Sequence, residues 1–119
     1  MHILLTRQLQ DSQDLIQKFK FNGFKVSNLP LLEIKKFDYD EIKSYNYNAI
    51  VFTSSNAIRF LDLKNINKKS LCFCVGSYTE KTARCNGFQN VFAADGNVRN
   101  LKELIQQNLS EKDNKILYV

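Results

Sequence analysis

The sequence predicts an α/β fold with a parallel sheet, and three observations support this prediction. Apolar runs of strand length recur along the 119 residues, and those at 49–52 and 71–75 lack the polar alternation of strands that face water. Amphipathic helical patterns separate the runs, which is the order expected of right-handed βαβ units. Hydrophobic residues make up 44% of the chain, which is enough to build a core and argues against disorder.

The N-terminal part is expected to begin with a strand that is covered on both faces. In chain order, we expect a strand, a helix, a linker strand and a weakly helical charged segment at residues 2–6, 8–21, 25–34 and 35–45. Asn22 and Gly23 supply the left-handed residue that ends such a helix. Pro30 cannot donate a ladder hydrogen bond, so its strand is assigned to a sheet edge or to a crossing between domains.

The strand and helix patterns then repeat. We expect strands at 49–52, 71–75, 90–93 and 115–119, and helices at 56–63, 77–86 and 98–109. The residues Phe-Asn-Gly-Phe at 21–24 recur as Cys-Asn-Gly-Phe at 85–88, each time between a helix and a strand. This repeat is consistent with two similar βα modules, although any helix-to-strand loop can use the same residues.

The composition favours a soluble protein with an anionic partner. Lys and Arg number 17 against 12 Asp and Glu, so the net charge is +5. The basic residues are scattered and form no stripe along a helix, so no nucleic-acid partner is expected. No stretch approaches the roughly 20 apolar residues that cross a bilayer. The start lacks a signal-peptide pattern, so we expect a cytoplasmic protein with no membrane partner. We also expect it to be a monomer.

The cysteines are expected to be free and structural. Cys72, Cys74 and Cys85 make an odd number in a chain without an export signal, which disfavours a disulfide framework. Cys72 and Cys74 point to one face of an expected buried strand, where a thiol packs as a small apolar group. His2 is the only histidine, so we expect no metal site and no cofactor.

Candidate binding residues follow the expected strands at the points where helices begin. The carboxyl ends of parallel strands share one edge of a sheet, and helix N-termini attract anions there. The candidates are Thr6, Arg7, Thr53, Ser54, Ser55, Asn56, Gly76, Ser77, Thr79, Gly96 and Asn97. No phosphate loop and no Ser/His/Asp set accompanies them.

Some of these candidates also have a purely structural interpretation. Ser77 with Glu80 fits a capping box, and the hydroxyl of Thr53 or Ser54 could cap the helix that follows. Thr79 lies inside the first turn of its expected helix, where no cap is required. Thr79 is therefore the candidate whose hydroxyl is hardest to explain by capping.

Five segments, in order along the chain, resemble motifs of the uroporphyrinogen-III synthase family. They are Ile3-Leu4-Leu5-Thr6-Arg7, Leu29-Pro30-Leu31-Leu32-Glu33-Ile34, Ile50-Val51-Phe52-Thr53-Ser54-Ser55-Asn56-Ala57, Val75-Gly76-Ser77-Tyr78-Thr79 and Ile116-Leu117-Tyr118. The sequence departs from the family pattern at Gln8, where proline is common, and at Asn48, where aspartate is common. Neither position is expected to take part in chemistry.

The resemblance implies an incomplete two-domain fold of flavodoxin-like topology. Residues 1–34 would contribute to a discontinuous first domain, and residues 35–119 would form most of the second, truncated at its C-terminal end. Hydroxymethylbilane would bind between the domains, lose water and close to uroporphyrinogen III with inversion of ring D, a lyase reaction of heme biosynthesis. Thr79 would lie near the reacting centre and the other candidates would hold carboxylates. The rest of the protein would complete the cleft, so this chain alone is expected to be inactive.

Two other functions remain open at this point. A non-catalytic flavodoxin-like or receiver-like module that binds an anion or another ligand would share the alternating strands and helices. A receiver, however, needs clustered acidic residues after its early strands, where this chain has Thr6, Arg7, Thr53 and Ser54. A small nucleic-acid-binding domain would fit the net charge but not the dispersed lysines.

Overall fold

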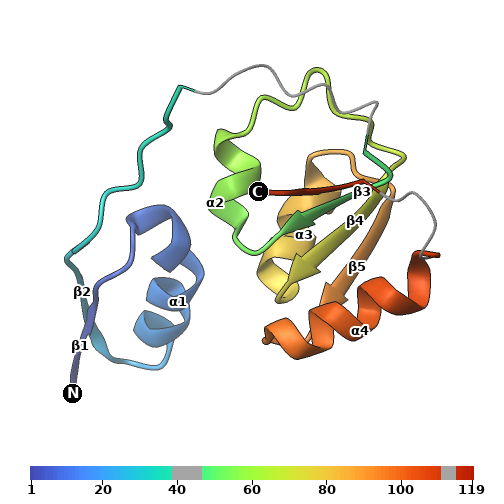
Figure 1. The fold of residues 1–119 in the computed structure, drawn as a ribbon. Helices are drawn as coiled ribbons and strands as arrows, with labels where there is room; N and C mark the ends of the chain where they lie inside the picture. The colour runs from blue at the N-terminus through green and yellow to red at the C-terminus, as the bar shows by residue number, and fades with distance from the viewer. Residues whose placement is uncertain (39–46, 111–114) are drawn as a thin grey trace. The chain divides into compact units, whose positions relative to one another are not determined.

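The computed structural model describes residues 1–38, 47–110 and 115–119. They divide into two compact units, Met1–Lys36 and Phe37–Val119. Each unit consists of parallel strands joined through helices, which confirms the predicted α/β class (Figure 1). Of the weakly helical segment expected at 35–45, residues 39–45 lie outside the described residues. No helix in the described ranges is long and apolar enough to span a membrane.

The first unit is a two-stranded parallel sheet with one helix. Its elements are β1 (His2–Leu5), α1 (Leu9–Phe21) and β2 (Lys25–Asn28). The strand predicted at 25–34 is too long, since β2 ends at Asn28. Pro30 has no N–H to continue the ladder, although Leu31 N still donates to the Thr6 carbonyl oxygen at 3.0 Å.

The first unit has almost no interior. The prediction that its first strand is covered on both faces is wrong, because β1 and β2 alternate between exposed and half-buried residues and the single helix α1 can cover one face only. Ser12 is the only buried residue between 1 and 36. Leu4, Phe21 and Leu32 are 57%, 92% and 78% exposed. A unit this small lies below the roughly 40 residues at which chains usually fold without further support.

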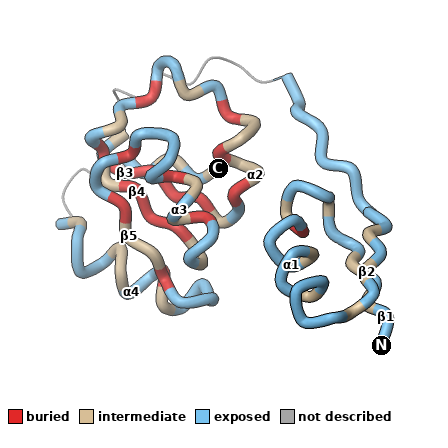
Figure 2. The backbone as a smooth tube through the Cα atoms, turned by 180° about the vertical axis from the view of Figure 1, so that it is seen from behind, coloured by how far each residue is buried: buried red, intermediate tan, exposed pale blue. Residues whose placement is uncertain are grey.

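The second unit is a four-stranded parallel sheet between two helical layers. Its elements are β3 (Ala49–Phe52), α2 (Ser55–Phe60), β4 (Leu71–Val75), α3 (Ser77–Cys85), β5 (Asn90–Ala94), α4 (Val98–Asn108) and β6 (Ile116–Tyr118). Ile58 of α2 and Ala83 of α3 pack with Ile50 on one face, and Leu101 of α4 packs with Val51 on the other. The buried residues concentrate in these strands (Figure 2).

The strand order of the second unit differs from the flavodoxin-like order that the resemblance implied. The order is β5-β4-β3-β6, which is 3-2-1-4 when counted within the unit, whereas flavodoxins begin 2-1-3. The connections through α2 and α3 run in one direction, so right-handed crossovers place both helices on the same face. The connection through α4 runs back across the sheet, which places α4 on the opposite face (Figure 1). The direction of winding therefore reverses between β3 and β6.

The sequence repeat at 21–24 and 85–88 is also a structural repeat. In both copies the asparagine amide donates to the carbonyl oxygen four residues earlier, at 2.8 Å. Gly23 and Gly87 follow with φ of 78° and 90°, a conformation that favours glycine. In both copies the phenylalanine N–H then donates to the carbonyl oxygen five residues earlier, at 3.0 and 3.3 Å. These bonds define a Schellman motif at the end of α1 and of α3.

Two of the three thiols lie in the core, as predicted. Cys72 and Cys74 are free, fully buried and on one face of β4, with their Sγ atoms 3.8 Å apart. The hydrogen bond to Cys74, together with burial, raises the pKa of Cys72. Cys85, at the end of α3, is exposed. The described parts of the chain contain no group of three or more His, Cys, Asp or Glu side chains that could hold a metal ion.

This arrangement predicts that a thiol-alkylating reagent labels the folded chain at Cys85 alone. Burial slows the reaction of Cys72 and Cys74 because the reagent cannot reach their sulfur atoms, and the raised pKa of Cys72 also reduces its thiolate fraction. Peptide mass spectrometry after brief labelling should locate the modification at Cys85, and labelling in denaturant should reach all three cysteines. Cys85→Ser is the control and should remain almost unlabelled. Rapid labelling of Cys72 or Cys74 in the folded chain would contradict their burial.

Candidate functional site

The structure brings most of the predicted site residues to one edge of the second unit. β3, β4 and β5 are adjacent and parallel, so the loops that follow them leave the sheet on the same side. These loops and the helix starts beside them contain Thr53, Ser54, Ser55, Asn56, Gly76, Ser77, Thr79, Gly96 and Asn97. Gly76 N donates to the Ala94 carbonyl oxygen at 3.0 Å, which ties the loop after β4 to the end of β5. We refer to this group of loops as the carboxyl edge.

The loop after β3 lies where the direction of winding reverses. In doubly wound sheets ligands bind beyond the carboxyl ends of the strands at such a reversal. Thr53 follows β3 directly and is half-buried, whereas Ser55 is buried. Ser54 is the N-cap of α2, and its Oγ accepts a hydrogen bond from Asn56 N at 3.2 Å. Thr53 and Ser54 therefore lie at the position in this sheet that is best placed to meet a ligand.

The predicted capping box of Ser77 and Glu80 is wrong. The N-cap of α3 is Gly76, with φ 82° and ψ 151°, and no side chain caps the helix. The chain therefore enters α3 through a glycine conformation, which makes Ser77 the first helical residue instead of the cap. Glu80 N donates to the Gly76 carbonyl oxygen, while the Glu80 carboxylate pairs with Arg84 at 2.9 Å.

Thr79 lies in the first turn of α3 and is only 6% exposed. Its Oγ1 makes no hydrogen bond to any other residue within 1–38, 47–110 or 115–119. Thr82, on the same helix, differs because its Oγ1 donates to the Tyr78 carbonyl oxygen at 2.9 Å. Thr79 is thus a buried residue at the carboxyl edge whose hydroxyl the local helix does not use.

The loop after β5 is held by asparagine side chains. Asn97 is the N-cap of α4, and its Oδ1 accepts from Asn100 N at 2.9 Å. The Asn100 amide in turn donates to the Asp95 carbonyl oxygen at 3.1 Å. Asn97, like Ser54, therefore has a structural role in addition to any contact with a ligand.

Thr6 and Arg7 belong to the first unit, where they connect β1 to α1. The Arg7 carbonyl oxygen accepts from Asn28 Nδ2 at 2.9 Å and from Ser12 Oγ at 3.4 Å, so the loop has a defined backbone. Both predicted site residues are exposed. Their participation in one site with the carboxyl edge stays a prediction.

Sequence reasoning missed an arginine network at the carboxyl edge. Arg59 of α2 donates from Nη1 to Asn56 Oδ1 at 3.0 Å and from Nη2 to Tyr78 Oη at 2.7 Å. The guanidinium carbon lies 5.7 Å from the centroid of the Tyr78 ring. The spacing of three residues between Asn56 and Arg59 suggests a contact on one helix face. Nothing in the sequence indicates that Tyr78 of α3 lies beside them.

The second unit is of the three-layer parallel α/β class. Its hydroxyl and amide groups gather at the carboxyl edge, where the direction of winding reverses. A family model described as uroporphyrinogen-III synthase HemD matches residues 13–119. The chain therefore belongs to the uroporphyrinogen-III synthase family. A comparison with curated proteins gave no match.

The cap assignments predict that one of two substitutions lowers the stability of the chain and that the other leaves it almost unchanged. Asn97→Ala removes the acceptor for Asn100 N and should lower the free energy of unfolding by about 1 kcal/mol. Ser77→Ala removes an exposed hydroxyl that caps nothing and should leave stability within about 0.5 kcal/mol of wild type. Denaturant unfolding monitored by circular dichroism measures both. A larger loss of stability in Ser77→Ala than in Asn97→Ala would contradict Gly76 as the cap of α3 and support the capping box of Ser77 and Glu80.

Proposed function

We propose that the protein containing this chain is a uroporphyrinogen-III synthase, a lyase of heme biosynthesis. It closes hydroxymethylbilane to uroporphyrinogen III, with loss of water and inversion of ring D. Membership of the family supports the reaction class. The observation that carries the proposal for this chain is the position of Thr53 and Ser54 beyond β3, where the winding of the sheet reverses. We further propose a cytoplasmic monomer that needs no cofactor.

The chemistry of the carboxyl edge suits such a substrate. Each pyrrole ring of hydroxymethylbilane carries an acetate and a propionate, so the ligand is a flexible polyanion. Hydroxyls, side-chain amides and the first N–H groups of helices donate hydrogen bonds to carboxylates without the desolvation cost of burying many cations. The net charge of +5 also favours the approach of a polyanion.

The reaction makes few demands for strong acid or base groups. Departure of the hydroxyl group as water leaves an azafulvenium cation that the electron-rich pyrrole stabilises. Ring D then attacks this cation through a spiro intermediate, which rearranges to the inverted product. The protein therefore contributes mainly by holding the two ends of the chain of rings in a reactive geometry and by donating a hydrogen bond to the leaving oxygen.

We assign that hydrogen bond to Thr79. Thr79 is a buried residue in the first turn of α3, and its hydroxyl is not used by any described residue of the chain. The positive end of the helix would add to the polarisation of the leaving oxygen. Ser54 and Asn97, whose side chains cap helices, would contact carboxylates instead.

This assignment predicts a graded loss of turnover when Thr79 is replaced. In the longest natural protein that contains this chain, Thr79→Ala should lower kcat about tenfold, because one neutral hydrogen bond is removed and the substrate ionises readily without it. Thr79→Ser should keep most of the activity. The product is quantified by chromatography of the oxidised type III isomer.

Thr82→Ala is the matched control for this experiment. It removes a threonine hydroxyl from the same helix. Unlike the hydroxyl of Thr79, this hydroxyl already donates to the Tyr78 carbonyl oxygen. Turnover should stay near that of wild type. Wild-type kcat in Thr79→Ala would remove Thr79 from the proposed mechanism while leaving the family assignment intact.

The exposed state of the first unit predicts that the 119-residue chain alone is inactive. Leu4, Phe21 and Leu32 expose large apolar surfaces, so this unit is expected to need further packing before Thr6 and Arg7 are held in place. Incubation of hydroxymethylbilane with the chain should give only the type I ring that forms spontaneously. Type III product above that background would show that no further residues are required.

A further inference from the structure

The start of α3 has backbone N–H groups that no described residue accepts. Helix bonding begins with Glu80 N, which donates to the Gly76 carbonyl oxygen at 3.2 Å. The N–H groups of Ser77, Tyr78 and Thr79 precede that bond, and no side chain caps the helix. A Cβ at Gly76 would meet no atom of the described chain within 4 Å other than its chain neighbours. The place of a capping side chain is therefore open, and the helix start presents three donors to a ligand.

The helix starts of α2 and α4 differ from that of α3. Ser54 Oγ accepts from a backbone N–H of α2 at 3.2 Å, and Asn97 Oδ1 accepts from one of α4 at 2.9 Å. Glu80 is acidic and lies in the first turn of α3, but its carboxylate pairs with Arg84 at 2.9 Å. Of these three helix starts, that of α3 is the one at which no described side chain accepts a hydrogen bond.

Thr79 adds a side-chain donor to this helix start. The residue is only 6% exposed, and its hydroxyl has no partner among the described residues. Helical side chains lean towards the N-terminus of their helix, so this hydroxyl is directed at the same place as the three N–H groups. In the described chain, Lys68 Nζ is the only fully buried side-chain nitrogen or oxygen without a partner, so Thr79 Oγ1 keeps some accessible surface. A ligand at the helix start can therefore reach it.

Such a set of donors suits an oxyanion. The start of a helix carries about half a positive charge, and hydrogen bonds from N–H groups to an anion are stronger than those to a neutral acceptor. Negative charge that develops on a departing oxygen is stabilised in the same way. When the bond between carbon and oxygen in the hydroxymethyl group breaks, the oxygen keeps the electron pair and the pyrrole takes the positive charge. The oxygen then leaves as water with a proton from the solvent.

We propose that the start of α3 is an oxyanion site, formed by the N–H groups of Ser77, Tyr78 and Thr79 together with the Thr79 hydroxyl. It binds a small free oxyanion, such as inorganic phosphate, and in the enzyme it receives the leaving oxygen. Phosphate therefore competes with hydroxymethylbilane, because both use the same donors. The competition rests on the proposed function, whereas phosphate binding to the helix does not, so the two can be tested separately.

The first experiment measures phosphate binding to the 119-residue chain by NMR. Amide signals are followed during a titration with sodium phosphate at constant ionic strength. The amides of Ser77, Tyr78 and Thr79 should shift along one binding curve with a Kd of about 5 mM, as expected for a few hydrogen bonds to a single anion. The amides of Asn56 and Asn100 already donate to capping side chains and should shift little.

Two pairs of variants identify the donors. Thr79→Val removes the hydroxyl and keeps the branched shape, so it should weaken phosphate binding about fivefold. Thr82→Val makes the same change at a hydroxyl that bonds the helix itself, and should leave Kd within about twofold of wild type. Ser77→Asp places a carboxylate at the first helical position and should abolish binding, whereas the neutral Ser77→Asn should retain it.

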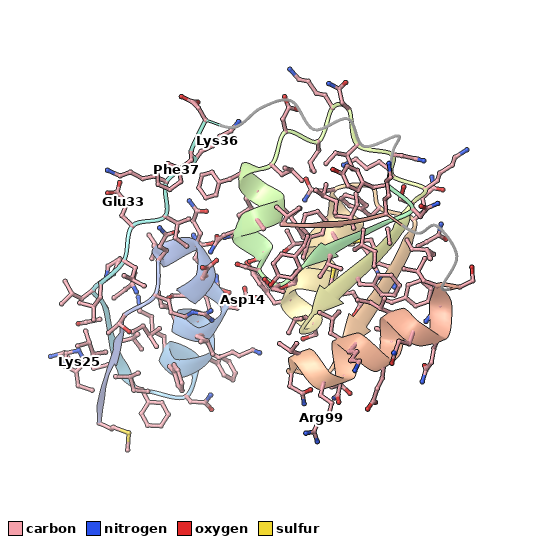
Figure 3. The ribbon with its side chains drawn as sticks, viewed as in Figure 1. Asp14, Lys25, Glu33, Lys36, Phe37 and Arg99 are labelled. Carbon is pink, nitrogen blue, oxygen red and sulfur yellow. The ribbon has the colours of Figure 1, made fainter. Side chains whose placement is uncertain are left out.

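Arg99→Gln is the control for net charge. Arg99 is exposed in the first turn of α4, and its side chain projects away from the sheet (Figure 3). Loss of this charge should change the Kd for phosphate by about twofold at most. If Thr79→Val does not fold, the two substitutions of the exposed Ser77 decide the question.

The second experiment measures turnover in the longest natural protein that contains this chain. At constant ionic strength, phosphate should raise the KM for hydroxymethylbilane and leave kcat unchanged. The KM should double at the phosphate concentration that equals the Kd from the NMR titration.

The two experiments separate failure of the site from failure of the proposed function. Absence of shifts at the three amides, or binding that survives in Ser77→Asp, would overturn the oxyanion site and leave the proposed function standing. Phosphate binding at α3 without any effect on KM would show that the leaving oxygen lies elsewhere, and would overturn the competition. A natural protein that forms no type III ring would contradict the proposed function, while the NMR titration would still decide the site.

Discussion

The handedness of the crossover connections governs the second unit. β3 pairs in parallel with β4 on one side and β6 on the other, so it is the strand from which the sheet extends in both directions. Because each crossover must be right-handed, the two directions require helices on opposite faces, and α2 and α3 are thereby separated from α4. The same constraint covers β3 on both faces and places its carboxyl end at the reversal of winding, where ligands bind in doubly wound sheets.

Burial of β3 on both faces confines polar chemistry to the edge of the sheet. Its side chains enter two separate cores, one with Phe52 against Phe88 and the other with Phe73 against Phe92, each at a ring centroid distance of 5.5 Å. No polar side chain is tolerated in such a strand without a partner. Thr53 is therefore the first residue after the strand at which a hydroxyl can serve a ligand.

Patterns confined to a few neighbouring residues were predictable from the sequence, and contacts that depend on strand order were not. The apolar runs located the strands of the second unit, and Asn-Gly-Phe indicated where α1 and α3 end. The cap of α3 was missed because it depends on the φ of Gly76, which no side-chain pattern encodes. The Arg59–Tyr78 contact joins residues 19 apart through the pairing of β3 with β4. The burial of Lys68 Nζ, which has no hydrogen-bond partner in the described structure, also depends on tertiary packing, and burial lowers the pKa of this lysine.

Helix capping and anion binding can be served by the same side chains because they use different hydrogen-bonding groups. The cap requires an acceptor, and Ser54 Oγ and Asn97 Oδ1 accept from backbone N–H groups at 3.2 and 2.9 Å. A carboxylate requires donors, which the Ser54 hydroxyl proton and the Asn97 amide NH₂ provide. In each residue the acceptor atom thus holds the start of the helix in place. Because the side chain is fixed by this bond, its donor group keeps a defined position. An edge built in this way can hold a polyanion with neutral groups, because the donors are kept in place by the same side chains that cap the helices.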